Sequence, residues 1–337
     1  MGVLKIYDAS GVIYTGQYNG FGSTASYKGI PTGGLFLLLQ KIGECVQRDV
    51  PYIVAMDSPT NKQFILPGYK GSRPRDPKIL FQNKLFYKYF GETSDNVHKI
   101  EGKEADTLIA KAVVDNYRNG EQFIDIYGAD YDLAHSIDDK GMVRSMPVNS
   151  NVGAITRENF ESMFSTRDIR VLFNSISMYK VLMGDNSDRV KPIEHQLPPE
   201  KLFNLFLGLS IKDGYTGDKL KSMECVDNFI LKATPLLGAE GIDEIRRRVS
   251  VVYPNEHLVD RDLSYKGVIN QTEALSIILS LTGCRRLADR LGIRFYEDMG
   301  EMQEDARRMY TECHEVSKTR HFVTDMSSEE FSNGRGF

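Results

Sequence analysis

The chain has 337 residues, of which 41% are hydrophobic and 26% charged, with four cysteines and no tryptophan. This composition is typical of a globular protein with one large or two domains, and it excludes disordered, collagen-like and membrane-spanning classes. The 42 basic and 46 acidic residues give a formal charge of −4. Taken alone, that charge argues against a nucleic-acid binder, because such proteins are typically basic.

The first half of the chain alternates short apolar runs with helical patterns. The predicted strands are Val3–Tyr7, Tyr52–Met56 and Phe123–Tyr127. Helices are predicted for Gly33–Val50, which Thr32 can cap, and for Glu104–Tyr117, whose acidic residues lie in the first turn where the helix dipole favours them. Alternation of this kind predicts an α/β fold with a mainly parallel sheet.

Residues 59–102 are unlike a simple connection between a strand and a helix. Four prolines interrupt the start, and Lys78–Phe90 then follows a helical pattern. The segment has eight basic and four acidic residues, a formal charge of +4, with aromatic residues interleaved. The aromatic residues are typical of a helix packed on the core, but a basic aromatic surface can also carry single-stranded nucleic acid.

After residue 190 the pattern becomes mainly helical. The predicted helical stretches are Pro199–Leu209, Asp218–Leu237, Ile242–Val251, Thr272–Leu291 and Tyr296–Phe322. We therefore expect a domain over residues 1–190, a helical region over 191–326 that is a candidate for DNA binding, and a flexible tail over 327–337.

The cysteines and the N-terminus predict a cytoplasmic protein. The cysteines are scattered, with neither zinc-site nor disulfide-framework spacing, so we expect reduced thiols at Cys45, Cys225, Cys284 and Cys313. The first residues predict a strand rather than a signal peptide, and no apolar run is long enough to cross a membrane. No membrane partner is expected.

Eight carboxylates lie where predicted strands end or other elements begin. They are Asp8, Asp57, Glu104, Asp106, Asp130, Asp132, Asp185 and Asp188. Any one of them is typical of a turn or a helix cap, but the carboxyl ends of strands in α/β sheets also line the ligand crevice. Carboxylates that converge there need cations between them, and oxygen ligands favour Mg²⁺ or Mn²⁺. Two such ions about 3.5–4 Å apart can activate water for phosphodiester hydrolysis.

Seven short stretches, in order along about residues 1–190, resemble the 5′→3′ exonuclease and flap endonuclease family. That family includes the phage ribonuclease H enzymes and the 5′-nuclease domain of bacterial DNA polymerase I. The stretches are Ile6-Tyr-Asp-Ala-Ser10, Gly29-Ile-Pro-Thr-Gly33, Val54-Ala-Met-Asp57, Pro67-Gly-Tyr-Lys-Gly-Ser-Arg73, Gly102-Lys-Glu-Ala-Asp-Thr107, Gly128-Ala-Asp-Tyr-Asp-Leu133 and Gly184-Asp-Asn-Ser-Asp188.

The resemblance implies a PIN-like α/β domain with a helical arch at about residues 59–102, and it implies a role for each site residue. The first metal would be held by Asp57, Glu104, Asp106 and Asp130, with Asp8 bonded to its waters. The second metal would be held or approached by Asp132, Asp185 and Asp188. Lys70 and Arg73 would contact the scissile phosphate, and Tyr69 would stack on a terminal base. Further DNA contacts are expected from Lys62, Arg75, Lys84 and Lys88.

The function implied by the resemblance is a Mg²⁺-dependent 5′ nuclease with two or more ions, for which Mn²⁺ can substitute. It would cut DNA flaps or 5′ ends, and RNA–DNA hybrids as a further candidate, in replication or repair. Its partners would be DNA and other replication proteins, in the cytoplasm of a bacterium or a phage-infected host.

Two other interpretations stay open. Thr107 stands where the family often has a carboxylate, and residues 189–198 contain no glycine where the family has a Gly-rich hairpin loop. These departures favour a non-catalytic nucleic-acid-binding replication protein derived from the family. Asp130-Tyr131-Asp132 alone also suits the DxD motif of a glycosyltransferase. Substitute duplex contacts would come from Arg246 to Arg248, Arg285 and Arg286, or Lys318 and Arg320.

The eight carboxylates also change the meaning of the overall charge. Without them the chain has 42 basic and 38 acidic residues, a formal charge of +4. The acidic total is therefore compatible with a mildly basic protein that contains a site demanding metal ions.

Overall fold

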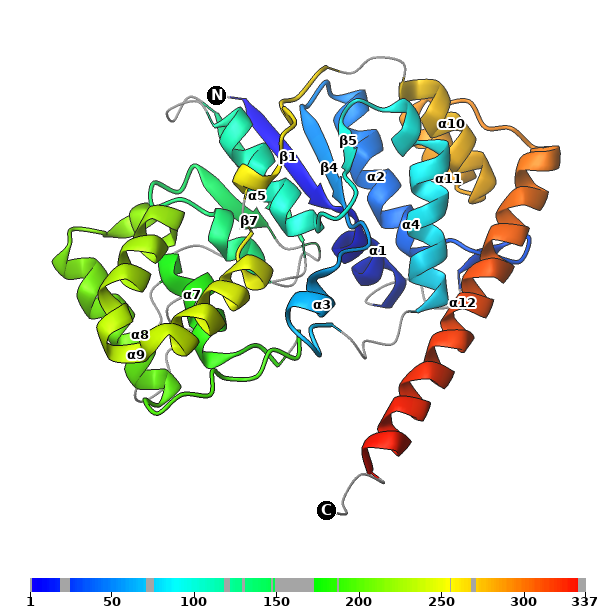
Figure 1. The fold of residues 1–337 in the computed structure, drawn as a ribbon. Helices are drawn as coiled ribbons and strands as arrows, with labels where there is room; N and C mark the ends of the chain where they lie inside the picture. Colours follow the sequence, from blue (N-terminus) through cyan, green and yellow to red (C-terminus); the bar gives the residue numbers. More distant parts are fainter. Residues whose placement is uncertain are drawn as a thin grey trace. The chain divides into compact units, whose positions relative to one another are not determined.

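The structure is a computed structural model, drawn in Figure 1. It describes residues 2–18, 25–70, 76–117, 122–128, 131–146, 148, 173–186, 188–254, 256–267 and 271–332, without the side chains of 131, 132, 173 and 318–332.

Within the described residues the main feature is a five-stranded sheet in the order β5-β4-β1-β6-β7. Its strands are β1 Val3–Asp8, β4 Tyr52–Met56, β5 Val97–Lys99, β6 Phe123–Tyr127 and β7 Val143–Met146. β6 and β7 are parallel, from the pair Ile124 and Val143 to the pair Tyr127 and Met146. A separate antiparallel pair joins β2 Ser26–Tyr27 to β3 Ile30–Pro31. The sheet is mostly parallel and flanked by helices, so the predicted α/β fold class is confirmed.

Helices make up most of the rest of the chain. The α-helices are α1 Ala9–Tyr18, α2 Gly33–Gln47, α3 Lys62–Ile65, α4 Pro77–Tyr89, α5 Ala105–Asn116, α7 Ile176–Met183, α8 Pro199–Lys212, α9 Met223–Val252, α10 Gln271–Leu281, α11 Arg285–Leu291 and α12 Gly300–Ser332. The 3₁₀ helices are η1 Gly91–Thr93, η2 Tyr131–Ser136, η3 Phe173–Ser175, η4 Gly217–Lys221 and η5 Glu256–Leu258. None of the described helices combines the length and apolarity that crossing a bilayer requires.

The chain divides into two compact units that interleave along the sequence. Unit 1 comprises Met1–Ile6, Asp57–Gly71 and Lys99–Ser264, and unit 2 comprises Tyr7–Met56, Ser72–His98 and Tyr265–Phe337. Unit 1 continues through residue 190, where the sequence places a domain boundary, so that boundary stays a prediction.

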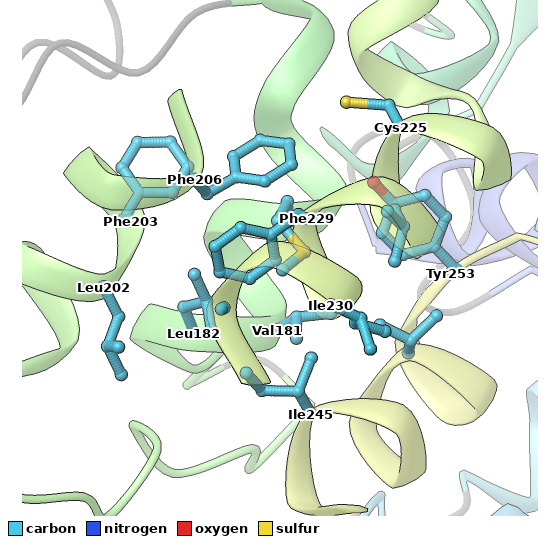
Figure 2. Close-up of a cluster of buried hydrophobic side chains, with 14 of the residues drawn as sticks. Val181, Leu182, Leu202, Phe203, Phe206, Cys225, Phe229, Ile230, Ile245 and Tyr253 are labelled. Carbon is cyan, nitrogen blue, oxygen red and sulfur yellow. The ribbon is translucent and has the colours of Figure 1, made fainter. Parts of the chain in front are cut away.

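Unit 1 has an apolar core built where α7, α8 and α9 pack on one another (Figures 1 and 2). The ring of Phe229 on α9 meets that of Phe206 edge-on, with 5.3 Å between the ring centroids. Phe206 in turn stacks against Phe203, with 6.3 Å between the centroids. All three rings are fully buried. Burial of side chains of this size is worth about 1.5–3 kcal/mol each, which holds the helical part of the unit together.

Unit 2 packs α4 against α1, α10 and α12. Phe81 of α4 is buried and meets Tyr310 of α12 edge-on at 5.2 Å. Asp76 caps α4 by accepting a hydrogen bond from Lys78 N at 2.7 Å, and Pro77 occupies the first helical position, where proline is tolerated. The helix predicted at Lys78–Phe90 is therefore confirmed, and its aromatic residue Phe81 packs on the core.

Several boundaries differ from the sequence predictions. The short strands β5 and β7 were not predicted. Within the described residues the Thr32 side chain makes no capping hydrogen bond, although Thr32 does occupy the N-cap of α2. The single helix predicted over Thr272–Leu291 is wrong, because Gly283 adopts φ +69° between α10 and α11. α12 continues to Ser332, into the range expected to be a flexible tail.

Candidate functional site

Glu104 is the centre of a cluster of charged groups in unit 1. Its Oε2 atom lies 2.5 Å from Lys62 Nζ and accepts a hydrogen bond from Tyr69 Oη at 3.0 Å. Its Oε1 atom lies 2.9 Å from Lys70 Nζ. Because Glu104 is 7% exposed, solvent screens these contacts less than it screens a surface ion pair. Burial alone would raise the pKa of Glu104, but Lys70 and Lys62 together lower it.

Asp57 leaves Glu104 available for these contacts by capping α5 in its place. Asp57 directly follows β4, and its Oδ1 atom accepts a hydrogen bond from Ala105 N, the first residue of α5, at 2.9 Å. Glu104 occupies the N-cap position, and within the described residues its own side chain makes no capping hydrogen bond. The helix start thus places Asp57 and Glu104 side by side, where the helix dipole also favours negative charge.

Asp106 adds a third acidic group in the first turn of the same helix. Its Oδ1 atom accepts hydrogen bonds from Thr107 N at 2.6 Å and Thr107 Oγ1 at 3.2 Å. Burial raises the pKa of Asp106, and Glu104 and Asp57 raise it further, while Lys62 and Lys70 oppose the rise. Burial is the largest of these effects, and the two lysines do not fully reverse the rise in pKa.

Lys70 joins the cluster to the turn that carries Asp188. Its backbone N donates to Asp188 O at 3.0 Å, and its Nζ lies 3.8 Å from Asp188 Oδ2. Lys70 adopts φ +49°, a left-handed conformation that costs a non-glycine residue about 1–2 kcal/mol. Burial opposes the charged form, but Glu104, Asp188 and Asp106 raise the pKa of Lys70 above its usual range. The ammonium group is therefore held charged in the cluster.

Asp185 and Asp188 lie on one tight turn but meet different lysines. Asp185 and Val190 exchange backbone hydrogen bonds of 2.7 and 2.8 Å, which closes the turn. Gly184 precedes it with φ +83°, and a Cβ atom there would lie 2.5 Å from Val190 O, so only glycine fits. Asp185 Oδ2 lies 2.7 Å from Lys180 Nζ, a contact that the sequence analysis missed although Lys180 precedes Asp185 by only five residues.

Arg248 holds the segment that follows this turn. It is 6% exposed, and its guanidinium donates to Lys191 O at 2.5 Å, Val181 O at 3.3 Å and Pro192 O at 3.4 Å. The suggested duplex contact from Arg248 is wrong, because a buried guanidinium engaged with three carbonyls is not available to DNA. The segment that replaces the expected Gly-rich loop is thus fastened to α7 and α9 by an arginine side chain.

The remaining candidate residues are placed as follows. Asp8 lies in unit 2, where its Oδ1 atom accepts a hydrogen bond from Gly11 N at 3.1 Å in the first turn of α1. Lys84 and Lys88 lie on α4 of unit 2, and Lys88 Nζ pairs with Asp305 of α12 at 2.6 Å. The candidates outside the described residues, or whose side chains are not described, are Arg73, Arg75, Asp130 and Asp132.

The residue types of the cluster, though not their arrangement in the described residues, suit a hard divalent cation. Asp57, Glu104, Asp106 and Asp188 supply carboxylate oxygens, the ligands that Mg²⁺ and Mn²⁺ prefer. Burial is the largest cause of the raised pKa of Asp106, and the neighbouring acids Glu104 and Asp57 add to it. Over the part of the chain that the structure describes, no three acidic, His or Cys side chains are arranged as a metal-binding group.

Comparison with known proteins finds one matching family model and several similar solved structures, of which two are described below. Residues 3–165 match the family described as 5′-3′ exonuclease, N-terminal resolvase-like domain. A crystal structure of the T5 D15 protein co-crystallised with metal ions is 14% identical, covers 91% of this chain and 99% of that chain, and has a TM-score of 0.49. The catalytic core of Rad2 in complex with a DNA substrate is 11% identical, covers 86% and 92%, and has a TM-score of 0.42. No curated protein matches the chain.

Proposed function

We propose, from the premise that residues 3–165 belong to the 5′-3′ exonuclease family, that this chain is a metal-dependent 5′-3′ exonuclease or flap endonuclease. The observation that carries the proposal is the buried Glu104 carboxylate, which Lys62, Tyr69 and Lys70 contact at the start of α5. A buried carboxylate beside two lysine ammonium groups brings together the kinds of charge that would bind a metal ion and a phosphate.

The first Mg²⁺ ion would be held by Asp57, Glu104, Asp106 and Asp130, with Asp8 on its waters. Asp132, Asp185 and Asp188 would hold or approach the second. When bound, two such ions activate water for attack and stabilise the leaving oxygen, and Mn²⁺ can take their place. The hydrolysis leaves a 5′-phosphate on the product.

The residues around Glu104 would prepare this site for a phosphodiester. Lys70 has its pKa raised by Glu104, Asp188 and Asp106 against the effect of burial, so its ammonium stays charged at neutral pH. It can turn from Glu104 to a phosphate oxygen when cations neutralise the acids, and offset the charge that develops there. Arg73 is expected to act on the same phosphate. Asp57, by capping α5, keeps Glu104 and Asp106 at the helix start where the ions would bind.

The substrate we propose is DNA with a 5′ end or flap, in replication or repair, and RNA–DNA hybrids are a second substrate to test. A non-catalytic nucleic-acid-binding protein derived from the family is the alternative. Thr107 favours it, because its hydroxyl bonds to Asp106 where a further carboxylate would serve a metal. A DxD glycosyltransferase is a third interpretation, which depends on Asp130 and Asp132 alone.

The decisive experiment incubates the purified chain with a labelled 5′-flap DNA in Mg²⁺ or Mn²⁺, with a chelator as control. Glu104→Gln keeps the size of the side chain but removes its charge, and we expect it to lower kcat at least 100-fold. Glu240→Gln makes the same chemical change on the exposed face of α9 and serves as the matched control. A chain that binds the flap without metal-dependent cleavage would support the non-catalytic alternative, and hydrolysis of a nucleotide sugar would support the third.

A further inference from the structure

Both oxygen atoms of the Glu104 carboxylate are engaged by side chains of the same compact unit. Lys62 Nζ lies 2.5 Å from Oε2, and Lys70 Nζ lies 2.9 Å from Oε1. Tyr69 Oη donates a further hydrogen bond to Oε2 at 3.0 Å. A carboxylate binds Mg²⁺ or Mn²⁺ through these same oxygen atoms. A divalent cation that approaches Glu104 therefore meets two ammonium groups at the atoms that it needs.

The two lysines differ in how they are enclosed. The Lys62 side chain is 13% exposed, whereas the Lys70 side chain is 33% exposed. Lys70 also faces a second carboxylate, because its Nζ lies 3.8 Å from Asp188 Oδ2. Lys62 is thus the more enclosed of the two cations, and its shortest ionic contact is with Glu104.

The backbone that carries Lys62 is anchored at the end of α3. Leu66, directly after the helix, packs in a buried cluster with Tyr69, Val190 and Val251. Leu66 N donates to Lys62 O at 2.8 Å, and Tyr69 N donates to Leu66 O at 3.1 Å. A lysine ammonium sits on a flexible four-carbon stem. The Lys62 ammonium can therefore leave Glu104 and return to it while the backbone stays in place.

Tyr69 brings the carboxylate and both cations together. The resemblance assigns Tyr69 to stacking on a base, but in this structure it is 5% exposed. Lys62 and Lys70 lie over its ring, with Nζ at 5.7 and 5.1 Å from the centroid. A cation over an aromatic face is attracted by the ring, so Tyr69 favours both lysines beside Glu104.

The charge of the two lysines matches that of a divalent cation. Together they carry two positive charges among the carboxylates of Glu104, Asp106 and Asp188. A buried carboxylate needs such a partner, because an unpaired buried charge is strongly destabilising. An ion pair that only fastens α3 to α5 would also explain the contact between Lys62 and Glu104, but it predicts no gain in metal affinity when Lys62 is removed.

We propose that Lys62 is a built-in counter-ion of Glu104 that a divalent cation displaces. This inference rests on the proposed function and deepens it, by naming a residue that sets the metal affinity of the site. The ammonium and the metal ion compete for one carboxylate, so each weakens the binding of the other. Lys62 is a positioning residue, because it holds Glu104 in place and acts on the metal ion through that carboxylate.

A Mn²⁺ titration of the full chain, followed by electron paramagnetic resonance, tests the competition without any substrate. Lys62→Met removes the ammonium but keeps most of the apolar stem, and we expect it to bind Mn²⁺ about 5- to 150-fold more tightly than the parent chain. Lys62→Arg keeps the charge and should bind Mn²⁺ like the parent. The matched control is Lys111→Met, which removes an 18% exposed lysine that pairs with Asp115 on α5, and it should leave Mn²⁺ affinity unchanged. Equal or weaker Mn²⁺ binding by Lys62→Met would overturn the proposal, and so would tightening of the same size in Lys62→Arg.

A second measurement uses the parent chain, so it does not depend on the folding of a variant. Trace acetylation in chelator and in Mg²⁺, followed by mass spectrometry, reports how available each lysine is. Displacement from Glu104 should raise the acetylation rate of Lys62 in Mg²⁺ about 3-fold or more, while the rate of Lys111 stays constant. An equal rate at Lys62 with and without Mg²⁺ would count against displacement and overturn the proposal.

The flap assay separates failure of this inference from failure of the proposed function. If the parent chain cleaves the flap in Mg²⁺ but Lys62→Met binds Mn²⁺ no more tightly, the counter-ion role fails and the proposed function stands. If the parent chain never cleaves but Lys62→Met binds Mn²⁺ more tightly than the parent, the proposed function fails and the counter-ion role stands.

Discussion

Replacement of Arg248 by methionine should destabilise the protein far more than the same replacement of its neighbour Arg247. Both arginines pair with Glu244, but only Arg248 is buried and donates to the carbonyls of Val181, Lys191 and Pro192. Arg247 has a side chain 50% exposed. Methionine keeps most of the apolar stem in both variants, so the comparison isolates the guanidinium.

The expected loss of unfolding free energy follows from the buried carbonyl groups that lose the Arg248 guanidinium as a donor. Each buried carbonyl that loses its donor costs about 1–3 kcal/mol, and hydrogen bonds to a charged donor contribute at the upper end of the usual range. Partial relaxation and water entry reduce the sum, so we expect Arg248→Met to lower the free energy of unfolding by about 3–5 kcal/mol. Arg247→Met removes one exposed ion pair, which is worth about 1 kcal/mol or less.

Urea denaturation of the two variants measures this difference directly. Hydrogen exchange adds a local test, because Ile193 N donates to Leu182 O at 2.9 Å beside the segment that Arg248 holds. Faster exchange at Ile193 in Arg248→Met would locate the loss at that segment. If the unfolding free energies of the two variants lay within 1 kcal/mol of each other, the hydrogen bonds of the buried Arg248 would not stabilise the fold as argued.

Three further outcomes are expected. Burial lowers the pKa of His135 to about 3 from 6.5, so the folded protein keeps it neutral while the unfolded chain protonates it. The free energy of unfolding should therefore fall as pH drops below 6.5, by about 2 kcal/mol between pH 8 and pH 5. Urea titrations at each pH should show that His135→Gln, which can keep a hydrogen bond to Ser177, lacks this loss of stability at low pH. Gly184→Ala should lower the free energy of unfolding by at least about 2 kcal/mol, because its Cβ would press on Val190 O at a positive φ, and an unchanged melting temperature would contradict this. Lys70→Gly and Lys70→Met should both lower kcat on a flap substrate at least 100-fold, while only Lys70→Gly relieves the left-handed backbone, so Lys70→Gly should be the more stable in thermal unfolding.

The fold class could be predicted because it depends on local patterns. The buried strands β4 and β6 are short apolar runs, and such runs predict strands buried on both faces wherever they lie in the chain. β7 could not be predicted in this way. Its sequence, Val143-Arg-Ser-Met146, forms a strand because it pairs with β6. Arg144 donates two hydrogen bonds, of 2.6 and 2.9 Å, to the buried Asp125 of β6. Both the strand and its charge pair depend on a partner that sequence spacing does not reveal.

The carboxylates were predicted as metal ligands because they lie at the ends of strands and the starts of helices, and that role stays a prediction. Their partners were not predicted. Asp185 and Asp188 are three residues apart, yet one meets Lys180 and the other lies near Lys70, and only the closed turn decides which. The exposure of aromatic residues was equally undetermined, since Phe64 on α3 is exposed whereas Tyr69, in the turn that follows α3, is buried.

By itself, therefore, the sequence determined the α/β class and the resemblance of residues 3–165 to a 5′-3′ exonuclease family, and it predicted which acidic residues a metal would need. The tertiary structure decided that Glu104 is met by two lysines and a tyrosine, that Arg248 is buried, and that Phe64 faces solvent. The physical reason is the distance along the sequence over which the responsible interactions act. Strand and helix patterns arise from neighbours along the chain, whereas burial, ion pairing and exposure arise from groups that folding brings together from far apart in the sequence.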